Sequence, residues 1–431
     1  MTRLWRHEVA GPVLLALAVT EGARRLLSPH EDVPAPAPVD LHDYFSDVEI
    51  ERGARYARPQ LALALARAVV DVGLMAALVA RPPGPVAAAS RAGRWRRQVA
   101  GGAAVAAAMA TGLTLPTLPL KAISRRRSIA AGLDTQSWGG WAGDLVKAAG
   151  IETVFAAAGG AVVVSATRRY PRGWWAAAGV GSVFVGAGLA AIAPVALDPI
   201  FNDFTPLPEG ETRSDVLALA RDADVKVGEV YSIDASRRTT AANAYVTGLG
   251  PTKRVVLFDT LLDRYDRDEV RVVVAHELGH VRHRDVMRSI AFAAIVAPAS
   301  ALAIQRLSWA LSDERGTPSA LPALALSAAI ISAPIGLIGN RLSRAVERRA
   351  DAFSLQLSGA PDAFVSFERT IAVQNVADLE PPRWVTDLLS THPPTDQRIG
   401  AALAFKSADA SGEPPPVGGR RVSGVNPRPV G

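Results

Sequence analysis

The chain of 431 residues contains no cysteine, and this absence excludes two kinds of structure at once. There can be no disulfide framework, and no zinc site can use thiolate ligands, so a metal would have to be held by histidine and carboxylate. Charged residues are also scarce, at 20% of the chain, whereas 49% of the residues are hydrophobic and the mean hydropathy is +0.16. This composition favours a polytopic membrane protein over two or three soluble domains.

The formal net charge is +6, but no nucleic-acid-binding module is recognisable. The arginines cluster beside apolar segments instead, as in proteins that face an anionic lipid bilayer. About 20 residues of helix cross the hydrocarbon, and segments of that length recur near 60–80, 98–120, 142–166, 174–197, 289–311 and 318–340. A weaker segment at 9–27, which we interpret as an uncleaved helix rather than a signal peptide, brings the prediction to about seven spans.

Three parts are predicted along the chain. Residues 1–205 form an N-terminal transmembrane domain of about five spans, in which the Pro-rich stretch 28–58 is expected to be a solvated loop. Residues 206–405 form a small α+β, zincin-like domain split by the last two spans, and the Gly/Pro/Arg-rich tail at 406–431 is expected to be disordered. Alternating apolar runs predict strands at Val230–Asp234, Asn243–Thr247 and Arg254–Asp259 after an amphipathic helix at Ser214–Val225.

The most informative stretch is the H-E-x-x-H run from His276 to His280, inside an apolar helical segment. Residues four apart lie on one face of a helix, so His276 and His280 can offer two imidazoles to one Zn²⁺. Glu277 can act as general base toward a metal-bound water. Asp266 and Glu269 read as a capping box that opens this helix. The spacing therefore predicts one catalytic zinc per chain.

A tetrahedral catalytic zinc also needs a third protein ligand and one open position. His283 is the nearest candidate, although three residues past His280 it fits the helix exit or the second shell better. A second helical pair, Glu347 and Asp351, places two carboxylates four apart on one face. Glu347 could ligate the metal while Asp351 accepts the remaining N–H of a ligand imidazole. A glutamate that stands among arginines is usually solvent-exposed. The residues alone therefore do not decide whether Glu347 or His283 is the third ligand.

These motifs together resemble the integral-membrane zinc metalloproteases of the type I CAAX prenyl endopeptidase family. The resemblance covers most of residues 110–405 and rests on the two motifs above and on further stretches at Gly132–Lys147, Asp198–Leu207, Asn243–Tyr245 and Ser390–Pro394 with Arg398. It implies that His276, His280 and Glu347 are the zinc ligands, with Asp351 and His283 in the second shell. It also implies that Asn243, Ala244 and Tyr245 bind an extended peptide substrate, which could add as a strand to this edge.

The resemblance implies a membrane-embedded zinc endopeptidase that trims C-terminal tripeptides, with a peptide or protein substrate that is lipidated or membrane-associated. Two alternatives remain. One is a quality-control protease like the HtpX-type enzymes, for which about four spans would be expected. The other is a catalytically silent protein with a structural zinc, against which Glu277 counts because no structural site requires it.

His392 lies in Ser390–Pro394, where two prolines hold the backbone extended and can present a side chain to a site formed elsewhere. An imidazole there could donate to the oxyanion that develops on the substrate carbonyl. Arg398 could act as a second donor or hold the segment through an ion pair. The alternative is a surface histidine before a Pro-Pro turn. His392, Arg398 and Glu277 are therefore the predicted catalytic group.

The predicted location is the cell membrane, with several spans. Arginine-rich loops at 81–97 and 168–172 would place the N-terminus inside by the positive-inside rule, but the 121–127 stretch carries four basic residues on the opposite side, so the bias is slight. The family resemblance implies the reverse, with the catalytic domain on the cytoplasmic side, and we follow it.

Overall fold

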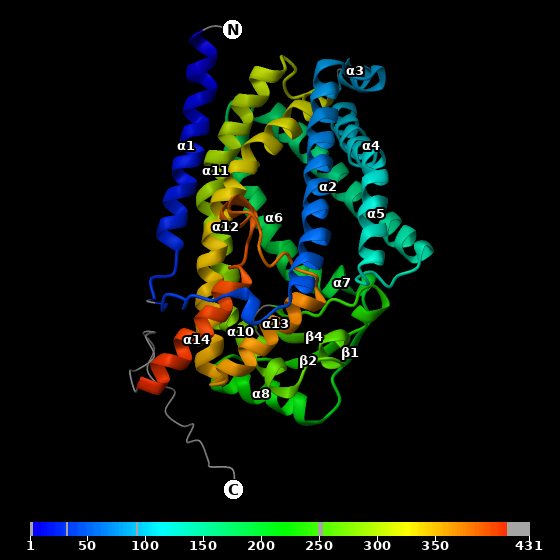
Figure 1. The fold of residues 1–431 in the computed structure, drawn as a ribbon. Helices are drawn as coiled ribbons and strands as arrows, with labels where there is room; N and C mark the ends of the chain where they lie inside the picture. Colours follow the sequence, from blue (N-terminus) through cyan, green and yellow to red (C-terminus); the bar gives the residue numbers. More distant parts are fainter. Residues whose placement is uncertain (1–2, 32, 92–93, 249–252, 412–431) are drawn as a thin grey trace. The chain divides into compact units, whose positions relative to one another are not determined.

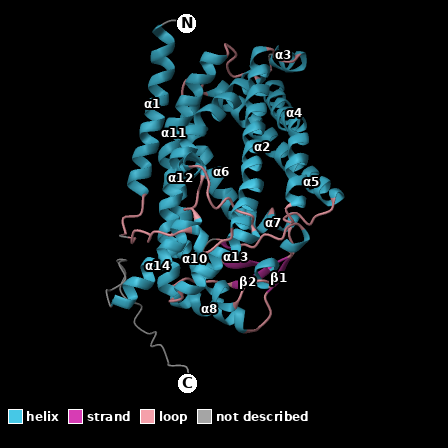
Figure 2. Cartoon of the chain, viewed as in Figure 1, coloured by secondary structure: helices cyan, strands magenta, loops and turns pink. Residues whose placement is uncertain are grey.

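The computed structural model describes residues 3–31, 33–91, 94–248 and 253–411, and the chain in it divides into two compact units. The first, here called the helical unit, takes its residues from 1–27, 55–192 and 287–341. The second, the sheet unit, takes its residues from 28–54, 193–286 and 342–431 and holds all of the strands that the structure describes. Figures 1 and 2 show the elements of both units, and helices account for most of them.

The helical unit is built from long apolar helices. They are α1 (Arg3–Leu27), most of α2 (Asp47–Ala80), α3 (Gly84–Arg91), α4 (Trp95–Ala130), α5 (Trp138–Arg169), α6 (Trp174–Ala196), α11 (Asp285–Leu311), the 3₁₀ turn η4 (Pro318–Ala320) and the first half of α12 (Leu321–Ser358). Among the described residues six helices are long and apolar enough to cross a membrane, namely α2, α4, α5, α6, α11 and η4 with α12. This confirms the predicted polytopic helical protein.

The seventh predicted span, α1, is helical but does not reach the same hydropathy, because Glu21, Arg24 and Arg25 interrupt its apolar run. It still packs on the spans: Val9 and Ala16 join a buried cluster with Leu307 of α11 and Ile331 of α12.

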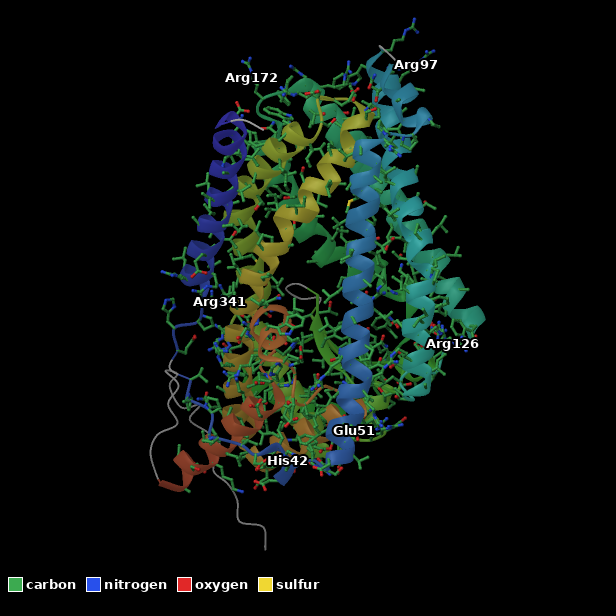
Figure 3. All side chains as sticks on the ribbon, turned by 45° about the horizontal axis from the view of Figure 1, so that its top comes forward. His42, Glu51, Arg97, Arg126, Arg172 and Arg341 are labelled. Carbon is green, nitrogen blue, oxygen red and sulfur yellow. The ribbon has the colours of Figure 1, made fainter. Side chains whose placement is uncertain are left out.

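Small residues let two spans approach closely. A Cβ on Gly160 of α5 would lie 2.5 Å from both the Gly102 carbonyl oxygen and the Ala106 side chain of α4. Because apolar side chains gain little by leaving lipid for protein, such close backbone packing is what holds membrane helices together. In Figure 3, Arg97 and Arg172 mark one end of the helical unit, and Arg126 lies toward the other.

The sheet unit contains a four-stranded sheet in the order β1 (Phe204–Pro206), β2 (Glu229–Ile233), β4 (Arg254–Phe258) and β3 (Ala244–Thr247). The β2 and β4 strands are parallel and the two outer pairs antiparallel. Valines 230 and 255 face α8 (Glu211–Asp222) and α10 (Arg267–Arg282), which together with α13 (Pro361–Gln374) close the main core. The predicted strands and amphipathic helix are present to within three residues at each end, and β3 is an edge strand as expected.

Short elements complete the sheet unit. They are η1 (Leu41–Asp43), α7 (Asp198–Phe201), η2 (Ala235–Arg237), α9 (Asp259–Leu262), the π-helical turn η5 (Val385–Leu389) and α14 (Thr395–Ser411).

Two sequence-based expectations need correction. The stretch 28–58 is not a solvated loop, because Phe45 and Ile50 are buried with Ile399 of α14 and the Ala37 N–H donates to the Gly400 carbonyl at 3.0 Å. The apolar residues that follow the proline run, Val39, Leu41, Tyr44, Phe45 and Ile50, carry this packing. The predicted tail also begins later than 406, because α14 runs to Ser411, and its remainder at 412–431 lies outside the described residues.

Candidate metal centre and active site

The helix α10 is fixed at its start by the predicted capping box. The Asp266 side chain accepts the Glu269 N–H at 2.8 Å, and the Glu269 side chain accepts the Asp266 N–H at 3.0 Å, which satisfies two of the free donors at the helix start. Val270, Val274 and Leu278 then bury one face of the helix against the sheet. Burying this face fixes the rotation of α10 about its axis and so determines where His276 and His280 point.

The candidate ligand atoms converge from two helices. The Nε2 atoms of His276 and His280 lie 3.1 Å apart, and Glu347 of α12 places its carboxylate oxygens 3.3 Å from the first and 3.6 Å from the second. Ligands 2.0–2.2 Å from a tetrahedral zinc are separated by about 3.3–3.6 Å. The two Nε2 atoms and the two oxygens of the Glu347 carboxylate therefore converge at separations close to those between zinc ligands.

The partners of the two Nδ1 atoms explain why the Nε2 atoms of His276 and His280 face each other and the Glu347 carboxylate. Nδ1 of His276 lies 2.9 Å from Asp351 Oδ1, and Nδ1 of His280 lies 3.0 Å from Asp285 Oδ2. A carboxylate beside Nδ1 favours the proton there, so in the neutral imidazoles both Nε2 atoms are acceptors that face the Glu347 carboxylate. Among the described residues, none donates a well-formed hydrogen bond to the buried Oε2 of Glu347. Three converging acceptors repel one another unless a cation lies between them, so the donor set fits Zn²⁺.

Glu277 is an alternative third member of this cluster, because one of its carboxylate oxygens lies within 4.8 Å of the histidine ligand atoms. Glu347 fits the third position better, because its oxygens are close to both Nε2 atoms and Glu277 has another partner. The backbone N–H of Val246 in β3 donates to the Glu277 carboxylate, and burial raises the pKa of that carboxyl. This places a proton acceptor between the ligand histidines and the edge strand.

Each ligand histidine is backed by a carboxylate that is itself held by a buried arginine. Arg398 of α14 donates to both oxygens of Asp351, at 2.9 and 2.5 Å, and its third nitrogen lies 2.7 Å from Glu368. Arg398 is therefore fully engaged behind His276 and does not face the ligand atoms. Of its two predicted roles, the structure favours holding the segment through ion pairs. Burial raises the pKa of Glu368 to about 7.

The second histidine has a similar arrangement that sequence reasoning missed. Asp285 accepts from His280 and from Arg349, and Arg349, which is 2% exposed, also lies 3.8 Å from Glu31. The sequence feature that could have pointed to Asp285 is its place five residues past His280, just beyond the predicted end of the helix.

His283, predicted in the second shell or as a third ligand, lies elsewhere. A ring nitrogen is 2.8 Å from the Gly279 carbonyl oxygen, and the ring packs edge-on against Phe353. Burial lowers the pKa of His283. In the part of the chain that the structure describes, its contacts do not include the candidate ligands, and Asp285 occupies the second-shell position expected for it.

His392 does come to the centre. Its Nε2 atom lies 3.4 Å from the same Glu347 oxygen that approaches His276, while Nδ1 lies 2.9 Å from the Thr391 hydroxyl. The side chain is 62% exposed, so it stands at the open side of the cluster. The rigid Ser390–Pro394 segment is held by Arg344, which donates to the Ser390 carbonyl at 2.5 Å.

The predicted substrate-binding stretch lies on the edge strand β3. The Asn243 carbonyl accepts the Phe258 N–H at 3.1 Å, and because antiparallel pairing alternates, the backbone groups of Ala244 and Val246 point away from β4. The Asn243 side chain is exposed, whereas that of Ala244 is buried in the core. The Tyr245 ring packs edge-to-face against that of Phe258, and burial raises the pKa of Tyr245 to about 12.

Comparison with known proteins gives two family matches that together cover most of the chain. Residues 24–203 match the family described as CAAX prenyl protease N-terminal, five membrane helices, and residues 206–406 match Peptidase family M48. The crystal structure of S. mikatae Ste24p aligns with a TM-score of 0.76 over 93% of this chain and 100% of that one, at 20% sequence identity, which shows that the fold is shared.

Curated relatives agree with these matches. A Bacillus subtilis protein named uncharacterized metalloprotease YhfN is 32% identical over 304 residues, 68% of this chain and 71% of the relative. CAAX prenyl protease 1 of Saccharomyces cerevisiae is 41% identical over 102 residues, 23% of this chain and 22% of the relative. A protease HtpX homolog of Pyrococcus abyssi is 33% identical over 205 residues, 42% of this chain and 68% of the relative. The chain therefore belongs to the M48 metallopeptidases of the CAAX prenyl protease type and is a multi-pass membrane metalloendopeptidase.

Proposed function

We propose that His276, His280 and Glu347 hold one Zn²⁺ and that Glu277 is the general base. Zinc bound there supplies a Lewis acid that polarises the scissile carbonyl and acidifies a coordinated water. Glu277 accepts the proton of the attacking water and returns it to the leaving amine, and its burial keeps its proton affinity suited to both steps. The observation that carries this assignment is that the two Nε2 atoms, 3.1 Å apart, converge on one carboxylate, whose oxygens lie 3.3 Å from His276 and 3.6 Å from His280.

The remaining residues bind and orient. An extended peptide adds to the outward backbone groups of β3, where the Ala244 carbonyl can accept and the exposed Asn243 side-chain amide can donate; the Ala244 N–H, which donates to Asn243 Oδ1 at 2.9 Å, becomes available when that side chain turns to the substrate. His392, on the open side of Glu347, donates to the developing oxyanion. Arg398 is a positioning residue that acts through Asp351 on His276.

The zinc assignment is tested by purifying three single variants. His276→Ala and Glu347→Ala are expected to lose zinc and activity, because each removes a ligand. Glu277→Gln is expected to keep stoichiometric zinc and lose peptidase activity, because the amide cannot accept the proton. Zinc content by elemental analysis separates the two cases. Stoichiometric zinc in Glu347→Ala would overturn the ligand set.

We propose as substrate class the C-terminal segments of proteins that are lipidated or otherwise bound to the membrane. The supporting observation is that the first half of the chain matches the CAAX prenyl protease N-terminal family, whereas the HtpX relative aligns with only 42% of the chain. Six candidate spans also exceed the four expected of an HtpX-type protease. An HtpX-like role in membrane protein quality control is the second candidate, because identity to that relative is as high as to the bacterial metalloprotease.

Peptide assays distinguish the two. Wild type and Glu277→Gln are compared on a farnesylated C-terminal peptide, on the same peptide without its lipid, and on an unfolded membrane protein. The proposal expects cleavage of the lipidated peptide at least tenfold faster than of the bare one, only by the wild type. Preferential degradation of the unfolded protein at internal sites would favour the quality-control role instead.

We propose further that the metalloprotease domain faces the cytoplasm. The natural absence of cysteine permits single-cysteine labelling without background. Arg97→Cys and Arg126→Cys, at opposite ends of the helical unit, and Arg221→Cys in the sheet unit are treated with a membrane-impermeant maleimide in intact cells and in inverted vesicles. Arg221→Cys is expected to react only in inverted vesicles, and labelling in intact cells would reverse the orientation.

A further inference from the structure

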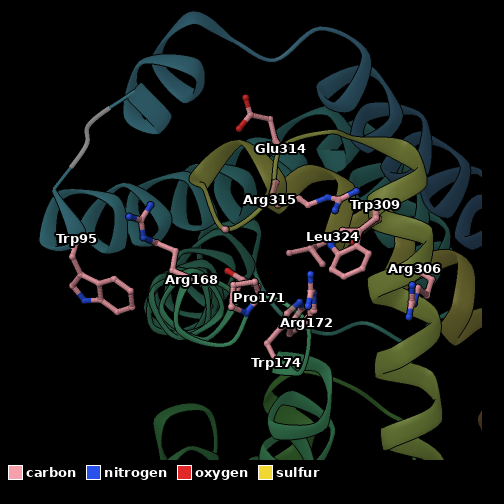
Figure 4. Close-up of a pocket in the computed structure, with 14 residues that line it drawn as sticks. Trp95, Arg168, Pro171, Arg172, Trp174, Arg306, Trp309, Glu314, Arg315 and Leu324 are labelled. Atoms are coloured by element: carbon pink, nitrogen blue, oxygen red, sulfur yellow. The ribbon is translucent and has the colours of Figure 1, made fainter.

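A cavity of about 690 Å³ lies at the end of the helical unit where α5 passes into α6 and α11 into α12. Figure 4 shows its lining, which comes from five different helices or the loops between them. Four arginines, three tryptophans and one glutamate supply most of the large side chains. None of these residues belongs to the sheet unit, so the cavity is separate from the metal centre.

The four arginines are Arg168, Arg172, Arg306 and Arg315, and three of them contact an aromatic ring. Arg168 lies 5.7 Å from the ring of Trp95, and Arg306 and Arg315 lie 5.4 and 4.6 Å from that of Trp309. Within the described part of the chain no carboxylate forms an ion pair with any of the four. Cation–π contacts leave the guanidinium edges free to donate hydrogen bonds.

Two of these guanidinium groups have an unpaired buried donor. The Nε atoms of Arg168 and Arg306 are buried, and no acceptor within the described ranges of the chain bonds to them. A buried donor to which nothing is bound costs free energy, and a charged one costs more than a neutral one. The unpaired Nε atoms thus indicate that an acceptor external to the chain completes the site.

The one carboxylate on the lining does not balance the arginines. Glu314 accepts a hydrogen bond from Thr317 at 2.8 Å, and in Figure 4 its carboxylate points away from Arg172 and Arg306. Four positive charges and one negative charge leave the lining with a formal charge of +3. Each planar guanidinium group can donate two parallel hydrogen bonds to the oxygens of one phosphate group. Four guanidinium groups therefore offer enough donors for two phosphate groups.

The cavity lies where four candidate spans end, and span ends meet the headgroup region of a bilayer. The α5 span ends at Arg169 and the α11 span at Leu311, while Trp174 begins α6 and Pro318 precedes α12. Tryptophan and arginine gather at the ends of spans because their rings and charges suit the headgroup region. Basic pockets between such span ends bind anionic headgroups.

We propose that this cavity binds a phosphate-bearing anion, and that an anionic phospholipid headgroup is its source. The volume is in the range of small-molecule sites, which is enough for a glycerophosphate headgroup with its two ester arms. A soluble di- or polyphosphate has the same chemistry and is distinguished by experiment.

The test uses the full-length protein in a neutral detergent. It is titrated separately with phosphatidylglycerol, phosphatidylcholine and inorganic pyrophosphate, and binding is measured by native mass spectrometry and by the shift in melting temperature. Arg172→Gln/Arg306→Gln removes two cavity charges. Arg96→Gln/Arg97→Gln is the matched control, because it removes two exposed charges near the start of α4 that do not line the cavity.

The proposal expects phosphatidylglycerol to bind the wild type and the control within twofold of each other, and the cavity variant at least tenfold more weakly. If pyrophosphate competes with phosphatidylglycerol and also binds the cavity variant more weakly than the control, the site takes its phosphate from a soluble compound. The proposal would be overturned if phosphatidylglycerol bound both double variants equally weakly. It would also be overturned if neither phosphatidylglycerol nor pyrophosphate bound the wild type. Should the cavity variant fail to fold, as judged by its peptidase activity and gel filtration, Arg315→Gln against Arg96→Gln repeats the comparison with exposed side chains.

Discussion

Asp285 offers a sharp test of how the metal centre is built, because one carboxylate serves two partners. It accepts from Nδ1 of His280 at 3.0 Å and from the buried guanidinium of Arg349. Asparagine has nearly the same shape but only one acceptor oxygen. In Asp285→Asn that oxygen can face His280 or Arg349, and the amide N–H₂ must then face the other.

Either orientation has a cost that can be estimated. If the amide donates toward His280, the imidazole carries its proton on Nε2, where it cannot bind a metal, and removing such an outer-shell partner typically lowers metal affinity 10–100-fold, or about 1.4–2.7 kcal/mol. If the amide faces Arg349, a guanidinium only 2% exposed loses its nearest anion, which costs about 3–5 kcal/mol of stability. Asp285→Asn is therefore expected to lower zinc affinity and the melting temperature together.

A double variant separates the two effects. Arg349→Met added to Asp285→Asn removes the unpaired buried charge, so stability is expected to recover while zinc affinity stays low. Zinc affinity is measured by competition with a chromophoric chelator, and stability by thermal unfolding of the detergent-solubilised protein. If Asp285→Asn loses stability but binds zinc within twofold of the wild type, the expectation that the amide N–H₂ faces His280 is wrong, because the remaining oxygen then still serves His280 or His280 needs no such partner.

Three further outcomes follow from local geometry. His392→Ala is expected to retain zinc but to lose about 10²–10³-fold in kcat with little change in KM, as for other oxyanion donors, and an unchanged kcat would remove His392 from the mechanism. The Arg267 guanidinium holds the pKa of Asp215 below its unfolded value of about 3.9. The ion pair therefore stabilises the fold fully above that pH, and this stabilisation is lost as the pH falls through the folded pKa of Asp215. The difference in melting temperature between the wild type and Asp215→Asn should accordingly close in acid. Gly160→Ala is expected to cost about 1–3 kcal/mol by overpacking, whereas Gly159→Ala next to it meets nothing within 4 Å and should cost none, and equal melting temperatures would contradict the close helix contact.

The sequence was most informative where the functional residues lie on a single helix. His276 and His280 share a face by their spacing alone, and so do Glu347 and Asp351, so both halves of the candidate ligand set could be predicted without knowing how the helices pack. That the two halves meet was implied only by the resemblance to a family, since no local rule predicts that distance.

The second shell could not be read in the same way. Asp285 reaches His280 only because the chain turns sharply between α10 and α11, where Arg284 adopts a left-handed backbone with φ of 56°. A non-glycine residue rarely takes this conformation, and nothing in the sequence signals it. Glu368 and Arg349 likewise become partners of the centre only through the packing of α13 and α12. Tertiary contacts of this kind carry no periodic pattern that could predict them.

The order of the ligands along the chain has a consequence for how the enzyme is made. On the proposed ligand set, His280 emerges first and Glu347 follows only after the two candidate spans of α11 and α12. A chain still being inserted into the bilayer thus carries two imidazoles and a base but no third ligand. Hydrolytic competence arises only when that hairpin of spans is in place, so a nascent or stalled chain is not a protease, and membrane insertion itself acts as the step that activates the enzyme.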